Sequence, residues 1–179
     1  TLDQAFPQFA ETALHETYDA QSVNRDALAE RARAKGIAFS ADDTWSDIFS
    51  RVLVEKIDPY LGLYLPEVLC EYPVHEAALA RPKPDYPRVA ERFELYVCGV
   101  ELANGFGELN DAGEQRRRFE KWMDDKERIY GERYPVDEDF LAALAHMPPA
   151  AGCALGFDRL VMLATGATHI DQVLWTPLP

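Results

Sequence analysis

The stretch from residue 91 to residue 111 constrains the fold more than any other part of this 179-residue chain. Apolar and polar side chains alternate in its first half, which reads FELYVC, and a period of two is typical of a half-buried strand. Gly99 follows, and glycine readily adopts the positive φ angles that a tight hairpin turn requires. The sequence therefore predicts an antiparallel hairpin with strands near residues 89–98 and 100–107.

The second strand of this hairpin carries an unusual set of polar side chains. Glu101, Asn104 and Glu108 fall within eight positions, and Gly105 and Gly107 lie among them. Two carboxylates and an amide can supply oxygen ligands to a cation, or acceptors to an ammonium group. Each acid alone would more often be an ordinary surface residue, so the prediction of a binding site depends on their combination.

A second stretch near the end of the chain, GCALGFDRLVML (152–163), supplies the complementary charge. Its pattern predicts a short strand near residues 152–157 and a helix that opens near Asp158, an acid suited to the first turn of a helix. The guanidinium of Arg159 can stack on a flat ring and bridge phosphate oxygens. Alone, Arg159 would more often form a salt bridge at a helix start.

Strand geometry sets a condition for a shared site. Side chains alternate between the two faces of a regular strand, and Glu101 is three residues from Asn104 and seven from Glu108. Both separations are odd, so a regular strand would place Glu101 on the opposite face from the other two. One inserted residue reverses the alternation. If the three side chains form one site, the strand needs a bulge or break within residues 102–107, and all three then lie on the face that receives Arg159.

The rest of the chain predicts further helices and one further strand. Helices are expected near residues 3–10, 25–35, 44–57, 114–130 and 137–145, a strand near 67–72, and a proline-rich loop at 81–87. Ser22 is the expected cap of the second helix, and Thr44 that of the third. The predicted fold class is thus α+β, with an antiparallel sheet and a helical segment before residue 60.

Composition limits the possible partners and the compartment. The net charge is −13, which disfavours a nucleic-acid backbone as a partner, although charge can be local. No apolar run approaches the roughly 20 residues of a membrane span. The three cysteines form no CxxC pair and favour reduced thiols in the cytoplasm. No histidine or cysteine cluster indicates a zinc site.

The two organising stretches, ERFELYVCGVELANGFGELND and GCALGFDRLVMLATGA, resemble the catalytic core of class II lysyl-tRNA synthetases. They are still more similar to the truncated paralogues of those enzymes, the elongation factor P lysyltransferases. The resemblance runs from about Tyr72 to Pro177. It implies a class II antiparallel sheet flanked by helices. Residues 64–179 would be the C-terminal part of the catalytic core and residues 1–63 a helical insertion segment, together forming a single domain.

The resemblance implies an ATP-dependent ligase that activates the carboxylate of a lysine-type amino acid, with Mg²⁺ bridging phosphate oxygens. By position, the ATP contacts would be Glu101, Leu102, Gly156 and Arg159, with Arg159 as the catalytic residue. The Mg²⁺ ligands would be Glu101 and Glu108. The amino-acid contacts would be Asn104, Phe106, Glu108 and Ala154. Phe106 alone would more often be a core residue.

Ala154 indicates which amino acid is used. Lysyl-tRNA synthetases commonly have glycine there, whereas the elongation factor P enzymes have alanine, and a methyl group at a pocket wall changes its shape. This favours (R)-β-lysine over α-lysine, with a lysine of elongation factor P as the acceptor. Family motifs 1 (dimer interface) and 2 (ATP-gripping loop) are absent from these residues. The resemblance therefore implies a homodimeric full-length parent, and we expect the 179 residues alone to be inactive.

Two alternatives remain at this point. The first is a lysyl-tRNA synthetase core that charges tRNA. The second is a non-catalytic paralogue that binds an amino acid or a protein partner, although such a module need not keep Glu101, Glu108 and Arg159.

Overall fold

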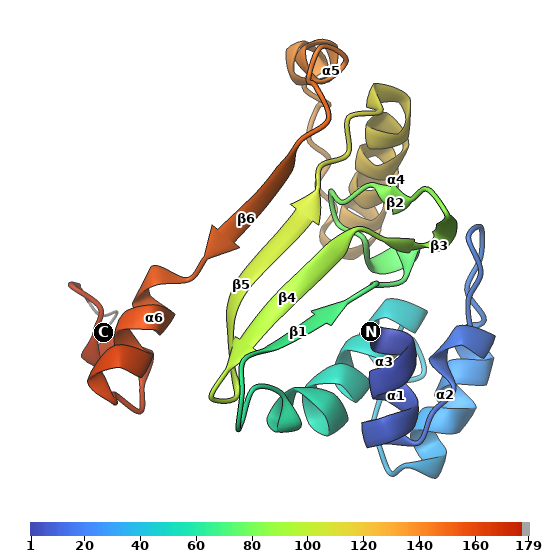
Figure 1. The fold of residues 1–179 in the computed structure, drawn as a ribbon. Coiled ribbons are helices and arrows are strands. Elements are labelled where there is room, and N and C mark those ends of the chain that lie inside the picture. Colours follow the sequence, from blue (N-terminus) through green and yellow to red (C-terminus); the bar gives the residue numbers. More distant parts are fainter. Residues whose placement is uncertain (177–179) are drawn as a thin grey trace.

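The computed structural model describes residues 1–176, so residues 177–179 of the predicted C-terminal unit lie outside the described part. Its α-helices are α1 (Leu2–Ala10), α2 (Arg25–Ala34), α3 (Trp45–Val52), α4 (Ala112–Tyr130), α5 (Glu138–Leu144) and α6 (Phe157–Thr165). Its strands are β1 (Glu67–Cys70), β2 (Pro82–Lys83), β3 (Tyr86–Ala90), β4 (Arg92–Val97), β5 (Val100–Gly107) and β6 (Ala151–Leu155) (Figure 1). The predicted α+β class is confirmed.

The main sheet is antiparallel, with strand order β1-β4-β5-β6, and β2 and β3 form a separate small ribbon. The turn between β4 and β5 consists of Cys98 and Gly99, with φ angles of 53° and 74°. Two successive residues with positive φ make the mirror-image turn whose twist matches two-residue hairpins. The predicted hairpin is confirmed, and its second strand has the expected bounds.

Side-chain caps define the helices of the N-terminal segment. The Thr44 hydroxyl accepts from the Asp47 amide, and the Asp47 carboxylate accepts from the Thr44 amide, so the predicted start of α3 is confirmed as a capping box. The predicted cap of α2 is wrong, because Asn24 and not Ser22 accepts from the Ala27 amide. Ser22 instead belongs to the preceding turn, where its amide donates to Asp19.

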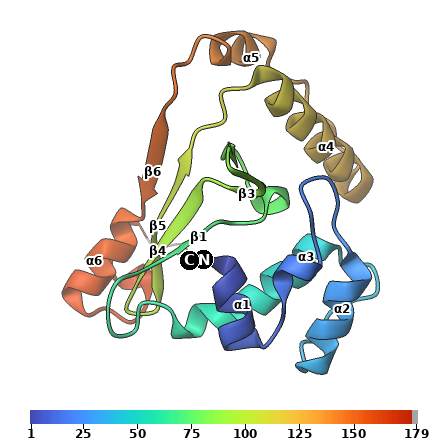
Figure 2. The same ribbon diagram turned by 45° about the vertical axis from the view of Figure 1, so that its right-hand side comes forward.

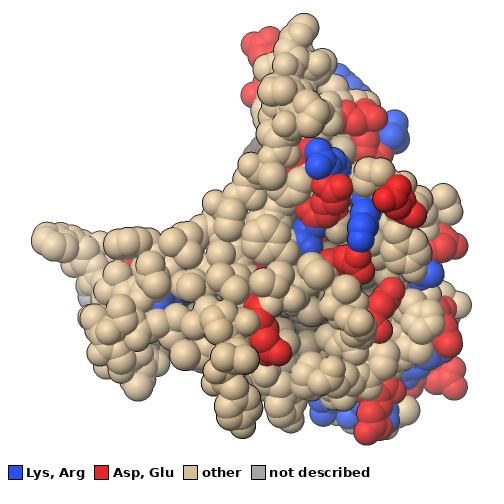
Figure 3. Space-filling view, in the orientation of Figure 1, with Lys and Arg blue, Asp and Glu red and all other residues tan. Residues whose placement is uncertain are grey.

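One hydrophobic core joins this helical segment to the sheet. Phe6, Ile48 and Ile57 from the helices pack in the same buried cluster as Leu69 and Tyr96 from β1 and β4. The helices therefore lie against the β1–β4 side of the sheet, while β6 and α6 extend away on the other side (Figure 2). Few charged side chains cover β6 and α6 in Figure 3, whereas charges gather over the helical segment, α4 and the β2–β3 ribbon.

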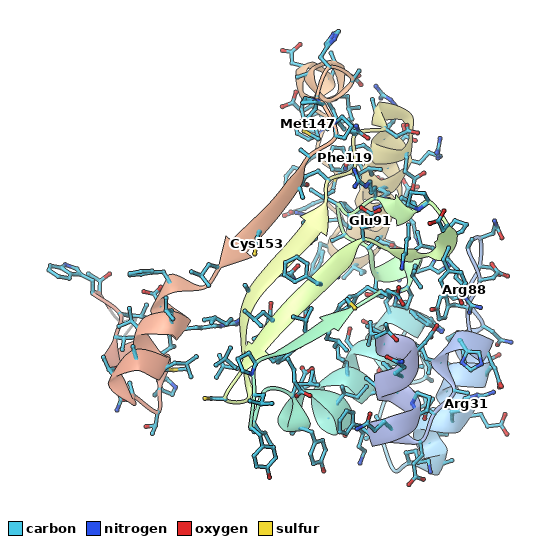
Figure 4. All side chains as sticks on the ribbon, in the orientation of Figure 1. Arg31, Arg88, Glu91, Phe119, Met147 and Cys153 are labelled. Atoms are coloured by element: carbon cyan, nitrogen blue, oxygen red, sulfur yellow. The ribbon has the colours of Figure 1, made fainter. Side chains whose placement is uncertain are left out.

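Two predicted segments differ from the structure around Glu91. The expected strand 89–98 is divided there into β3 and β4, and the expected loop 81–87 contains β2 and the start of β3. The Glu91 carboxylate accepts from Arg81 at 2.6 Å, and its carbonyl accepts from the Gly107 amide at 2.7 Å. Glu91 therefore joins the small β2–β3 ribbon to the end of β5 (Figure 4).

Gly62 connects the helical segment to the hairpin. Its carbonyl accepts from the Cys98 amide at 2.6 Å, and its amide donates to Glu67 Oε2 at 2.6 Å. Its φ is +68°, and an added Cβ would lie 2.6 Å from the carbonyl carbon and oxygen of Tyr96. Glycine is therefore required here both for conformation and for close approach. This contact fixes the segment that ends at Tyr60 against β4.

We predict that Gly62→Ala is much more destabilising than Gly36→Ala, which is the matched control. Gly36 has φ +73°, but an added Cβ there meets nothing within 4 Å. Gly36→Ala should lower the free energy of unfolding by about 1–2 kcal/mol, because alanine is strained in the left-handed conformation. Gly62→Ala should cost about 1–3 kcal/mol more because of the backbone clash. Urea unfolding measures both variants, and equal losses of stability would contradict the close approach at Gly62.

Candidate functional site

The strand that carries the predicted site contains a bulge. Tyr96 on β4 pairs with Glu101, whereas the preceding residue, Leu95, pairs with Ala103. Leu102 is therefore the extra residue, and the alternation of β5 reverses at this point. The predicted irregularity is confirmed. It lies at the start of the predicted range and does not coincide with Gly105 or Gly107.

The bulge brings the polar side chains of β5 to one face. Glu101 pairs with Tyr96 and Asn104 pairs with Glu94, and residues 94 and 96 lie on the same side of β4. Glu101 and Asn104 therefore share a face in spite of their odd separation. Ala154 on β6 pairs with Asn104, so it lies on this face as well.

The far end of β5 adds Phe106 and Glu108 to the same face. Phe106 pairs with Gly152 and packs against the small core around Ala80 and Ala90, so it is partly buried. A Cβ at Gly152 would lie 2.4 Å from Glu108 Oε1, which places this carboxylate directly over Gly152. Glycine at this position leaves the space that the carboxylate occupies.

Arg159 reaches the opposite end of β5 from α6. One guanidinium nitrogen, Nη1, donates to the Glu101 carbonyl at 2.6 Å and to Glu101 Oε2 at 3.3 Å. The Gly156 amide donates to the Leu102 carbonyl at 2.9 Å, which holds the start of α6 against the bulge. Both charged side chains keep substantial exposure, 44% for Arg159 and 35% for Glu101. The predicted meeting of Arg159 with Glu101 is confirmed.

The prediction that Glu101 and Glu108 are both Mg²⁺ ligands stays a prediction. Glu101 lies near the start of β5 and Glu108 directly follows its end, so their backbones are roughly 20 Å apart at about 3.3 Å per residue. Within residues 1–176, no group of three or more His, Cys, Asp and Glu side chains is placed to hold a metal. Magnesium is commonly held by one or two carboxylates together with substrate phosphates, and Glu101 is the predicted ligand that lies beside Arg159.

The structure adds Glu94, which the sequence reasoning did not select. Its side chain is only 8% exposed, and its Oε1 accepts from Arg92 at 2.7 Å and from Asn104 Nδ2 at 3.0 Å. Tyr96 Oη lies 2.9 Å from Glu94 Oε2. The apolar residues Phe93 and Leu95 face the other side and are less buried than Glu94 and Tyr96. The buried side of β4 is therefore the one that carries Glu94 and Tyr96.

Asn104 retains an unused acceptor. Its Nδ2 donates to Glu94, while its Oδ1 is buried and has no hydrogen-bond partner among the residues that the structure describes. A buried acceptor without a donor is costly, so this atom is suited to a ligand that brings a donor.

Asp58 also approaches this network, from the helical segment. Its Oδ1 lies 3.1 Å from Tyr96 Oη. The pKa of the Asp58 carboxyl is raised to about 6, mainly by burial; the hydrogen bond from the Tyr96 hydroxyl lowers it, and the nearby charges of Glu94 and Glu101 raise it. Sequence patterns did not indicate this residue, because its partner is 38 positions away.

We predict that Asp58 makes stability depend on pH. Its folded-state pKa of about 6 lies above the ordinary value of 3.8, so the folded state binds the proton more tightly. The stability that this bound proton contributes is fully present below about pH 4 and is lost as the pH rises through about 6. The Asp58→Asn variant has no carboxyl group to titrate at this position and therefore serves as the reference. The unfolding free energy of the wild type, relative to this variant, should therefore fall by about 1–2 kcal/mol between about pH 4 and pH 7, after allowance for solvent screening.

Urea unfolding of both proteins across this pH range measures the difference. Other carboxylates are common to the two proteins and cancel in the comparison. A difference that stays constant with pH would contradict the raised pKa.

Comparisons with known proteins show which family the chain belongs to. The family model described as tRNA synthetases class II (D, K and N) matches residues 63–178. The match begins beside the predicted boundary at residues 63/64, and the division itself remains a prediction. In the described part of the chain, no helix is long and apolar enough to cross a membrane.

Curated relatives carry two kinds of name. An elongation factor P--(R)-beta-lysine ligase of Haemophilus ducreyi is 43% identical over 157 residues, covering 87% of this chain and 48% of the relative. Its namesake in Proteus mirabilis is 41% identical over 165 residues, covering 89% and 50%. A lysine--tRNA ligase of Helicobacter pylori is 43% identical over 132 residues, covering 72% and 26%. The chain spans about half the length of the first two relatives, and it belongs to the class II tRNA synthetase family (D, K and N).

Proposed function

We propose that the full-length protein is an ATP-dependent ligase that activates a lysine-type amino acid as its adenylate and transfers it to a lysine of elongation factor P. The observation that carries the proposal is the common face formed by Glu101, Asn104 and Glu108, with Arg159 at one end. A cationic amino acid and an anionic nucleotide need opposite charges at the two ends of one site. Because the chain spans about half of its relatives, the activity is assigned to the whole protein.

The nucleotide lies at the Arg159 end in this proposal. The guanidinium covers the adenine and contacts phosphate oxygens, and Gly156 with the backbone of Leu102 leaves room for the nucleotide. Glu101 is the carboxylate beside those phosphates, and it would hold Mg²⁺ together with them. When bound, Mg²⁺ would neutralise charge on the phosphate oxygens. Arg159 adds positive charge where the amino-acid carboxylate attacks the α-phosphate and pyrophosphate leaves.

The amino acid lies towards the other end of the face. Glu108 provides a carboxylate for an ammonium group, and the free acceptor of Asn104 can take a further N–H donor. Phe106 supplies an apolar wall for the methylene chain. In this proposal Glu101 serves the nucleotide end, and Glu108 contacts the ammonium group of the substrate or takes part in holding Mg²⁺.

Ala154 supports (R)-β-lysine over α-lysine, since its methyl group lies on this face opposite Asn104. The names of the ligases from Haemophilus ducreyi and Proteus mirabilis favour elongation factor P as acceptor. Because the Helicobacter pylori relative is named a lysine--tRNA ligase, tRNA is the second candidate for the acceptor. As parts of the same proposal, the protein is a cytoplasmic homodimer, and Cys70, Cys98 and Cys153 are free thiols that suit a reducing compartment.

We predict that the full-length protein catalyses ATP–pyrophosphate exchange with a higher kcat/KM for (R)-β-lysine than for α-lysine. Ala154→Gly should reduce this preference by up to about tenfold, because one methyl-sized group is worth about 1 kcal/mol or slightly more. Equal use of the two lysines by the wild type would contradict the choice of substrate. No exchange with either lysine would contradict the proposed function.

We also predict that Gly152→Ala weakens binding of the amino acid about tenfold or more. The new methyl group would lie 2.4 Å from Glu108 Oε1, which is too close, and therefore displaces the carboxylate. Stability should change by less than about 1 kcal/mol, because the displaced atoms end a flexible side chain. Cys153→Ala is the matched control, since its side chain lies on the opposite face of β6. Calorimetric titration with the amino acid measures both variants, and unchanged affinity in Gly152→Ala would show that Glu108 does not hold the substrate.

A further inference from the structure

The Tyr96 hydroxyl lies between two carboxylates from different parts of the chain. It is 2.9 Å from Glu94 Oε2, on its own strand, and 3.1 Å from Asp58 Oδ1, in the turn Asp58–Tyr60 that follows α3. A phenol has a single hydrogen to donate. When both acids are ionised, only one of them can receive it, so Asp58 and Glu94 compete for the same donor.

Glu94 is the member of this group that reaches the predicted amino-acid site. Its other oxygen, Oε1, accepts from Asn104 Nδ2 at 3.0 Å and from Arg92 at 2.7 Å. The position of the Asn104 amide therefore depends on Glu94, and that of Glu94 depends partly on Tyr96. A continuous chain of hydrogen bonds thus connects Asp58 to the substrate face.

We propose that Asp58 is a positioning residue for the amino-acid substrate, acting through Tyr96 and Glu94 on Asn104. The inference rests on the proposed function and assigns to the helical segment a part in substrate binding. The inference concerns the amino-acid end of the site alone, because Arg159 forms its hydrogen bonds with Glu101 and not with a member of this hydrogen-bond chain. Interrupting this chain of hydrogen bonds should weaken binding of the amino acid and leave binding of the nucleotide unchanged.

The surroundings of Asp58 explain why it acts on Tyr96. The groups that face it are Tyr96 and Glu94 from β4 and Glu101 from β5, and none of these supplies a positive charge. Its pKa of about 6 reflects that environment. In the protonated state Asp58 can donate to Tyr96 Oη, so that Tyr96 donates to Glu94 and every hydrogen bond in the chain has a donor and an acceptor. An asparagine at position 58 can reproduce that arrangement through its amide hydrogens.

The test is steady-state ATP–pyrophosphate exchange by the full-length protein at varied lysine and varied ATP, below about pH 6, where Asp58 is protonated. Asp58→Leu removes the hydrogen-bonding group at similar volume, and we expect it to raise KM for the amino acid about tenfold, in the range of one hydrogen bond to a charged group. KM for ATP and kcat should change by less than about twofold. Asp58→Asn should restore KM for the amino acid to within about twofold of the wild type.

Tyr96→Phe removes one oxygen atom and provides the test if Asp58→Leu does not fold. It should raise KM for the amino acid to a similar extent, and adding Asp58→Leu to it should have no further effect, because both changes interrupt the same chain. The matched control is the other tyrosine–aspartate contact, in which Tyr18 Oη lies 3.3 Å from Asp3 within the helical segment. Tyr18→Phe and Asp3→Leu should leave all kinetic constants within about twofold.

The outcomes separate the two proposals. A wild-type protein that exchanges pyrophosphate, together with a Tyr96→Phe variant of unchanged KM, would overturn this inference and leave the proposed function standing. A fall in kcat with unchanged KM for the amino acid would overturn it as well. If the wild type shows no exchange with either lysine, both proposals fail.

Discussion

The extra residue at Leu102 is the constraint on which the rest of the site depends. Without it, Glu101 would face away from Asn104 and Glu108, and Arg159 would have no carboxylate partner on the substrate face. The same bulge turns the Leu102 carbonyl towards the Gly156 amide, which fixes the start of α6. One irregularity of the backbone therefore sets both the shared face and the approach of the helix that carries the arginine.

The second constraint is the attachment of the helical segment to the sheet. The close approach of Gly62 to the Tyr96 backbone holds the end of that segment at a fixed distance from β4. Asp58 lies four residues earlier, and its contact with the Tyr96 hydroxyl depends on this attachment. The burial of Glu94 and Tyr96 has the same origin, because the helices cover the β1–β4 side of this face. The helical segment thus shapes the site as well as the core.

The sequence predicted the local structure well where local chemistry decides it. The hairpin follows from alternation and from Gly99, and α3 follows from the Thr44 capping box. The bulge follows once Glu101 and Asn104, at an odd separation, are required by the family resemblance to share one site. The sequence did not predict the features that distant contacts decide. The buried phase of β4 depends on which face the helices cover, and the break at Glu91 depends on partners at Arg81 and Gly107.

The central claim is that one sheet face binds the lysine-type amino acid at Glu108 and the nucleotide at Arg159. The most direct measurement is a crystal structure of the full-length protein with a non-hydrolysable analogue of lysyl-adenylate. The account predicts an ammonium group of the analogue within hydrogen-bond distance of Glu108, and its adenine or phosphate against Arg159. An analogue bound on the opposite face of β5, or one that leaves both residues without ligand contacts, would contradict the account.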